Sequence, residues 1–201
     1  MVCFAAEETR TNDGAMTPLL EAALGFQTLL VQWNWRFCII GGIAVLRWGE
    51  PRFTRDVDLT IFAGFGREEE FIAPILGAGY RGRIEDVEAF AAKNRVLLLD
   101  SPSGVPFDVA LGGLPFEEQM VDRSTIFEFE PGCSLRTCSA EDLVIQKLFA
   151  FRKRDVLDAE TIVTRQGKNL DWNYMEQHLS ELAELKEDPE IMQFFSKLRR
   201  G

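Results

Sequence analysis

The pattern that most constrains the fold of this chain lies between residues 37 and 59. A short apolar run with β-branched residues is followed at once by Gly41-Gly42 and then by the helix-compatible stretch 43–46. Thirteen residues separate Gly42 from Asp56-Val57-Asp58, whose neighbour Leu59 is apolar. The sequence therefore predicts a strand, a glycine turn, a helix and a second strand that carries two aspartates.

Asp56 and Asp58 are expected to share one face of the second strand. Side chains at i and i+2 leave a strand on the same side, so the two carboxylates lie side by side while Val57 and Leu59 turn into the core. Like charges so close repel each other unless a cation lies between them, and Mg²⁺ takes carboxylate and phosphate oxygens. The pair predicts a metal site for phosphoryl transfer; the alternative is an edge strand with two solvated aspartates.

The Gly41-Gly42 turn predicts an anion site beside this metal site. Glycine permits positive φ and a close backbone approach, and the helix that begins here offers free N–H groups and a positive dipole end. Arg52 and Thr54, in the spacer, could add charge or a hydrogen bond to a phosphate. The alternative is an ordinary tight turn whose glycines serve packing only.

These two motifs together resemble those of the nucleotidyltransferase superfamily: an apolar residue, Gly-Gly, a spacer and Asp-apolar-Asp. The finer string, Gly41-Gly42-x-Ala44 and then Arg52-x-Thr54-x-Asp56-x-Asp58, is similar to the AbiEii-like branch. Members of this branch are often toxins of bacterial toxin–antitoxin pairs. The resemblance implies a polymerase-β-like α/β (α+β) fold, with helices packed on a small mixed β-sheet and a C-terminal helical subdomain.

The resemblance also implies a third carboxylate, on a later strand between apolar residues. Asp108 fits this description, because it lies between Phe107 and Val109. An apolar run over residues 95–100 ends at Asp100 and is followed by a turn rich in Ser, Pro and Gly. This run and the run around Asp108 therefore predict a hairpin or adjacent strands. Asp100 is the rival, although a turn aspartate commonly bonds its own backbone. For Asp108 the alternative is a polar position on a half-exposed strand.

A long helix is expected to begin at Ser139, as its N-cap, and to run from Leu143 to about Val163. The string around Lys147 is similar to a segment of the same branch. The resemblance implies that Lys147 contacts the triphosphate and that Asp155 or Asp158 orients it or a basic neighbour. The alternative is an amphipathic helix with salt-bridged surface charges.

The implied reaction is metal-assisted nucleotidyl transfer from an NTP, with pyrophosphate released. Two Mg²⁺ ions, with Mn²⁺ as a substitute, would be held by Asp56, Asp58 and Asp108. The acceptor would be an RNA or tRNA end or a protein, and a cognate antitoxin protein is an expected partner, whereas a membrane is not. Two alternatives stay open: a small-molecule (antibiotic) nucleotidyltransferase, and a non-catalytic nucleotide-binding or regulatory module of the same fold.

The net charge of the chain limits which nucleic-acid acceptors are expected. The chain has 32 acidic residues against 22 lysines and arginines, a net charge of −10, whereas proteins that grip long nucleic acids are usually basic. A local basic face is compatible with an RNA held at one end, but broad duplex binding is not expected. That face would consist of Arg52, Arg55, Lys147, Arg152, Lys153 and Arg154.

Composition predicts a cytoplasmic protein. No apolar run approaches the roughly twenty residues of a bilayer span, and residues 1–14 are polar and acidic, unlike a secretory signal. The four cysteines and single histidine have no zinc spacing, and free thiols indicate a reducing compartment.

Two parts of the chain are expected: a nucleotidyltransferase core with an N-terminal helix over residues 1–132, and a C-terminal helical subdomain over 133–201 that completes a cleft. After Pro131-Gly132 the chain is expected to be helical to its end, in segments near 140–165, 171–184 and 188–199. The expected strands are 37–40, 56–62, 95–100, 106–111 and 125–129, and the expected helices of the core are 18–33, 42–48, 67–77, 85–92 and a short one after Pro115.

Overall fold

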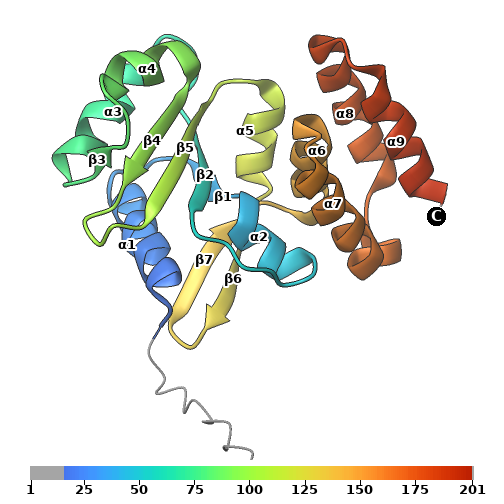
Figure 1. Cartoon of the computed structure of the whole chain (residues 1–201), viewed down its shortest axis with the longest axis horizontal. Helices are drawn as coiled ribbons and strands as arrows, with labels where there is room; N and C mark the ends of the chain where they lie inside the picture. Colours follow the sequence, from blue (N-terminus) through green and yellow to red (C-terminus); the bar gives the residue numbers. More distant parts are fainter. Residues whose placement is uncertain (1–15, 201) are drawn as a thin grey trace, which may run out of the picture.

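The computed structural model describes residues 16–200, so the expectation for residues 1–14 lies outside the described residues. Over this range the chain forms nine α-helices and one seven-stranded mixed sheet (Figure 1). The predicted fold class is therefore confirmed. Between residues 16 and 200, no helix has both the length and the apolar character needed to cross a bilayer.

Helices and strands are interleaved through the first two thirds of the chain. The strands are β1 Phe37–Ile39, β2 Val57–Phe62, β3 Arg81–Gly82, β4 Val96–Asp100, β5 Pro106–Gly112, β6 Thr125–Glu130 and β7 Cys133–Thr137. The helices are α1 Pro18–Gln32, α2 Gly41–Trp48, α3 Glu68–Gly77, α4 Val87–Asn94, α5 Pro115–Asp122, α6 Ala140–Ala150, α7 Lys153–Gln166, α8 Trp172–Lys186 and α9 Pro189–Arg200.

The sheet has the strand order β3-β4-β5-β2-β1-β7-β6. β4 and β5 form the expected antiparallel hairpin, and β5 then lies parallel to β2 at the centre of the sheet. β1 pairs antiparallel with β2 and parallel with β7. The central pair β2–β5 thus joins segments about fifty residues apart, which no local pattern specifies.

Two apolar clusters pack on opposite faces of this sheet. Alternate strand residues such as Leu59 and Phe107 join Phe26 of α1 and residues of α3 and α4 in one cluster. Cys38 points the other way and joins the second cluster, which contains residues of α2 and of α5 to α9, among them Leu148. Figure 1 shows α6 to α9 gathered to one side of the sheet, where they extend the second cluster.

The expectation that only helices follow Pro131-Gly132 is wrong. Residues 133–137 form β7, which pairs with both β6 and β1. Cys133, Leu135 and Thr137 are buried and alternate with more exposed residues, so the period-2 pattern of a strand is present. A division at residue 132 would separate two strands of one hairpin. We therefore propose that the core part extends to Thr137 and that the helical part begins at α6.

The helix expected to run from Leu143 to about Val163 is two helices. α6 ends at Ala150, Phe151 takes a left-handed conformation with φ of 56°, and the extended Arg152 precedes α7. No glycine or proline marks this break in the sequence. The N-cap expected at Ser139 is confirmed, because its hydroxyl accepts a hydrogen bond from the backbone N–H of Asp142 at 3.1 Å.

Candidate active site

The centre of the sheet brings two of the predicted carboxylates together. In the parallel register of β2 and β5, Asp58 lies directly beside Asp108. Their neighbours Leu59 and Val109 are buried on the opposite face, so both aspartates leave the sheet on the same side. The rival Asp100 pairs with Arg81 and Pro106 at the far end of its strand. The structure thus places Asp108, and not Asp100, next to Asp58.

The glycine turn is closed against Asp58. Gly41 has a φ of +56°, and a Cβ at this residue would lie 1.9 Å from Oδ2 of Asp58. The backbone N–H of Gly42 donates a hydrogen bond to the same oxygen at 3.4 Å. Glycine adopts this conformation without strain, and only glycine leaves room for this approach, so the turn brings the N–H of Gly42 in the first turn of α2 to the carboxylate.

Thr54 connects the spacer loop to both motifs. Its hydroxyl donates a hydrogen bond to Oδ1 of Asp56 at 3.0 Å. A Cβ on Gly42 would lie 2.2 Å from the same hydroxyl oxygen. Thr54, Asp56 and the glycine turn therefore form one packed unit.

Asp58 carries a destabilised negative charge. Burial raises its pKa to about 6, and the negative charges of Asp56 and Asp108 act in the same direction. The Gly42 N–H and the positive charge of Lys147 oppose this rise of the pKa. The site thus holds more negative charge than its protein partners neutralise.

The predicted basic residues form a separate, internally neutralised cluster. Nε and Nη2 of Arg52 each donate to one oxygen of Asp158 at 2.7 Å. Nζ of Lys147 lies 2.9 Å from Oδ1 of Asp155 and 2.9 Å from Oδ2 of Asp158. Although burial opposes ionisation of Asp158, the hydrogen bonds from Arg52 and Lys147 hold its pKa below the usual range. Asp158 therefore bridges the spacer loop, α6 and α7.

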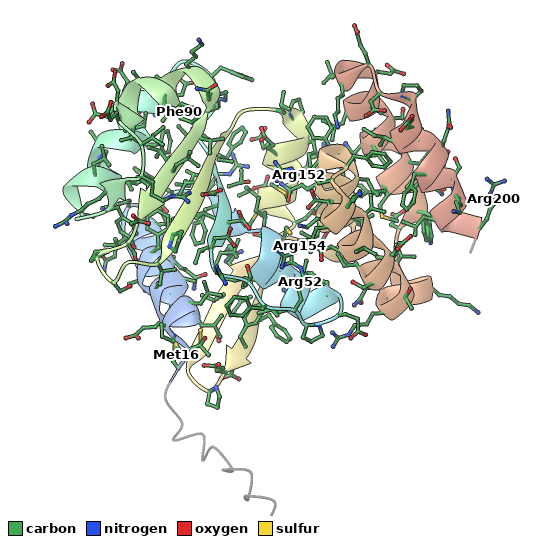
Figure 2. All side chains as sticks on the ribbon, in the orientation of Figure 1. Met16, Arg52, Phe90, Arg152, Arg154 and Arg200 are labelled. Atoms are coloured by element: carbon green, nitrogen blue, oxygen red, sulfur yellow. The ribbon has the colours of Figure 1, made fainter. Side chains whose placement is uncertain are left out.

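The remaining arginines of the expected basic face lie at the edge of this cluster. Figure 2 shows Arg52, Arg152 and Arg154 in the middle of the molecule, beside α6 and α7. Arg154 donates to the carbonyl oxygen of Phe53 at 2.9 Å. Within residues 16–200, neither Arg152 nor Arg154 forms an ion pair. The exposed part of the face therefore keeps its positive charge.

Two residues matter more than the sequence indicated. Asp158 contacts both basic side chains, whereas Asp155 contacts only Lys147. Arg83, which no motif singled out, forms an ion pair with Asp108. Across the described residues, no three His, Cys, Asp or Glu side chains are gathered as a ready metal cage.

Comparison with known proteins agrees with this geometry. A family model described as nucleotidyl transferase AbiEii toxin, type IV TA system, matches residues 28–184. No curated protein matches the chain.

Similar solved structures share the fold. The solution structure of the antibiotic-resistance factor ANT(2″)-Ia has a TM-score of 0.58 at 15% identity, with 84% of this chain and 95% of that chain covered. Its crystal structure in complex with adenylyl-2″-tobramycin has a TM-score of 0.52 at 17% identity, with 83% of this chain and 98% of that chain covered. The crystal structure of an antigenic nucleotidyltransferase-like protein from Paracoccidioides brasiliensis has a TM-score of 0.50 at 15% identity, with 88% of this chain and 91% of that chain covered.

Proposed function

Because the chain belongs to the AbiEii family of nucleotidyl transferases, we propose that it moves a nucleotidyl group from an NTP to an acceptor hydroxyl, with divalent metal ions at Asp56, Asp58 and Asp108. The observation that carries this proposal is the register that sets Asp58 beside Asp108, next to a glycine turn closed on Asp58. Such a site offers carboxylates to a metal and helix N–H groups to a phosphate.

The charges of this site fit a divalent cation. Asp58 is mostly buried among further carboxylates, and burial first, then the negative charges of Asp56 and Asp108, raise its pKa. A cation would favour that form. Mg²⁺ commonly binds one or two carboxylates and completes its shell with substrate phosphates and water, so a preformed three-carboxylate cage is not required. We propose that two Mg²⁺ ions bind here with the nucleotide and that Mn²⁺ can replace them.

The residues of the site supply the remaining parts of the reaction. The acceptor oxygen forms a bond to the α-phosphorus, the bond to the α–β bridging oxygen breaks, and pyrophosphate leaves. Asp108 would act as a metal ligand or take the proton of the acceptor hydroxyl. Backbone N–H groups of Gly41 and Gly42 would hold the β- and γ-phosphates. Bound metal ions would stabilise charge on the phosphates and lower the pKa of the acceptor hydroxyl.

Arg52 and Lys147 would line the triphosphate side of the site. The negative charges of Asp56 and Asp58 help to raise the pKa of Arg52, and the positive charge of Lys147 opposes the rise of the pKa of Asp58. Both cations therefore lie within electrostatic reach of the carboxylates. We propose that Asp155 and Asp158 orient these cations through their ion pairs. Thr54 would act indirectly, by holding Asp56.

For the acceptor, we propose an RNA or tRNA end or a protein, and for a partner a cognate antitoxin, because the family is described as a toxin of type IV TA systems. The exposed arginines beside Phe53 add a local positive surface to an acidic chain. We place the activity in the cytoplasm, where NTPs are available.

Incubation with each α-labelled NTP, Mg²⁺ and a bacterial lysate tests the proposal. RNA, protein and small molecules are resolved separately, and the Asp56→Ala/Asp58→Ala variant is the control. We expect label in the RNA or protein fraction with the wild-type chain only. Label among small molecules would instead support the antibiotic alternative, and ANT(2″)-Ia, which shares the fold, is itself solved with adenylyl-2″-tobramycin.

Thermal unfolding with NTP and Mg²⁺ separates catalysis from mere binding. A nucleotide that binds the folded state raises the melting temperature by mass action. Stabilisation without transfer in any fraction would favour the non-catalytic module over the proposed enzyme.

A further inference from the structure

Arg83 is connected to the site by the register of neighbouring strands. Its backbone N–H donates to the carbonyl oxygen of Leu98 at 2.9 Å, just beyond β3. Leu98 is the register partner of Asp108, and Asp108 is the partner of Asp58. The fold therefore holds Arg83 at a fixed position, from which its side chain reaches Asp108.

The Arg83 guanidinium is paired with the carboxylate of Asp108. Nη2 bonds Oδ1 of Asp108 and also lies 3.4 Å from the carbonyl oxygen of Phe107. Among residues 16–200, Asp108 has no other ion pair and neither does Arg83. Arginine stays protonated throughout the accessible pH range, so the pair persists wherever Asp108 is ionised.

Asp56 and Asp58 have no such counter-ion. In the same part of the chain neither forms an ion pair, and their partners are the Thr54 hydroxyl and the Gly42 N–H. Within residues 16–200, two of the three proposed metal ligands thus form no ion pair, whereas one oxygen of Asp108 is already engaged. The three carboxylates are therefore not equivalent toward a cation.

We propose that Arg83 is a counter-ion that a divalent metal ion must displace from Asp108, so that an ion binds first at Asp56 and Asp58 and a second, Asp108-dependent ion binds more weakly. This inference rests on the proposed function, in which Asp108 is a metal ligand. The side chains of Arg83 and Asp108 are 31% and 39% exposed, and ion pairs of such exposure are weak. Arg83 is therefore expected to weaken the second ion by about fivefold rather than to block it.

Binding of Mn²⁺ alone, followed by the electron paramagnetic resonance signal of the free ion, tests this inference without turnover. Arg83→Ala should tighten the weaker Mn²⁺ site about fivefold, and Arg83→Lys should bind nearly as the wild type does. The matched control is Arg81→Ala, because Arg81 is an exposed neighbour in β3 without an ion pair in the described range. Arg81→Ala should leave Mn²⁺ binding unchanged.

A double variant assigns the effect to Asp108. In an Asp108→Asn background, Arg83→Ala should have no effect on Mn²⁺ affinity, because the paired carboxylate is gone. Unchanged or weaker Mn²⁺ binding by Arg83→Ala, with thermal unfolding like that of the wild type, would overturn the inference alone. Failure of the wild type to bind Mn²⁺ even with a non-hydrolysable NTP present, or binding that survives Asp56→Ala/Asp58→Ala, would instead contradict the metal site of the proposed function.

Discussion

The acidic and the basic half of the site differ in how their charges are neutralised. On the sheet, Asp58 lies between Asp56 and Asp108 with a raised pKa and without an ion pair in the described residues. On the helical side, Asp158 binds Arg52 and Lys147, and its pKa is lowered. The two halves are joined by the short spacer loop that carries Arg52.

This difference indicates different tasks for the two halves. A carboxylate group that the protein leaves without a counter-ion is poised to take a cation from solution. A buried cation that the protein neutralises itself instead fixes geometry, because moving it would leave a charge without a partner. We infer that the sheet binds the metal ions and that the ion-paired cluster holds α6, α7 and the spacer loop in place, and with them the cations Arg52 and Lys147 on the triphosphate side of the site.

Asp158→Ala should have the largest effect on stability. The substitution leaves two cations without their shared partner, and loss of one member of a buried ion pair costs about 4 kcal/mol. The side chain of Asp158 is only 5% exposed, so solvent screening is small. Urea unfolding measures the change. The control Glu176→Ala removes an exposed pair with Arg199 and should change the free energy of unfolding little; equal losses in both variants would contradict the structural role.

Gly41→Ala should lower nucleotidyl transfer about 100-fold, because a displacement of about 1 Å at a catalytic group costs roughly that factor. The new Cβ would collide with Oδ2 of Asp58. Gly64→Ala is the matched control: Gly64 also has a positive φ, but nothing lies within 4 Å of its Cβ position. Both variants share the backbone strain, so comparable loss of transfer would show that strain alone, and not contact with Asp58, is responsible.

Asp58 and Asp158 should make the free energy of unfolding depend on pH in opposite directions. The folded pKa of Asp58, about 6, exceeds its unfolded value of about 3.9, so the native state binds the extra proton between these pH values. The free energy of unfolding should therefore fall by about 2 kcal/mol, from this group, as pH rises from 4 to 7 without metal. Asp158, whose folded pKa is lowered, contributes stability above its unfolded pKa and loses it as pH falls.

Urea unfolding in chelator at pH 4.5 and pH 7 checks this sign. Relative to the wild type, Asp58→Asn should gain stability as pH rises, because the amide has no charge to bury. Added Mg²⁺ should restore stability at pH 7 in the wild type only. A constant difference between the two proteins at both pH values would refute the destabilised charge of Asp58.

Thr54→Val should have the smallest effect, about a fivefold loss of transfer with near-normal stability. Only the hydrogen bond to Asp56 disappears, and such a bond contributes about 1 kcal/mol. Thr164→Val removes a hydroxyl that bonds a backbone carbonyl in α7 and provides the comparison. Transfer equal to that of the Thr164 variant would exclude a positioning role for Thr54.

Local patterns predicted the parts that local physics determines. Alternation predicted that Asp58 leaves the strand on the face opposite Leu59, and the glycine pair predicted a turn that opens a helix. Asp56, expected in the same strand, lies in a bend directly before β2. The ends of most helices and strands agree with the expected ranges within about two residues. The alternation of Cys133, Leu135 and Thr137 is that of a strand, but Pro131-Gly132 before it is equally typical of the end of a sheet, so the sequence does not single out β7.

Long-range pairing could not be predicted in the same way. The register of Asp58 with Asp108 and the contact of Arg52 with Asp158, 106 residues away, depend on packing of the whole chain. Arg83 lies in a segment without any motif, so nothing in the sequence connects it to Asp108. The break at Phe151 likewise has no glycine to mark its left-handed conformation.

The most direct test of the central claim compares three aspartates in one transfer assay with α-labelled NTP. Asp58→Asn and Asp108→Asn remove the pair that the register brings together, whereas Asp100→Asn removes the rival at the far end of β4. The account predicts a loss of about a thousandfold or more for the first two variants and near-normal transfer for the third, as expected when charges that stabilise the transition state are removed. Normal transfer by Asp58→Asn, or an equal loss in Asp100→Asn, would contradict it.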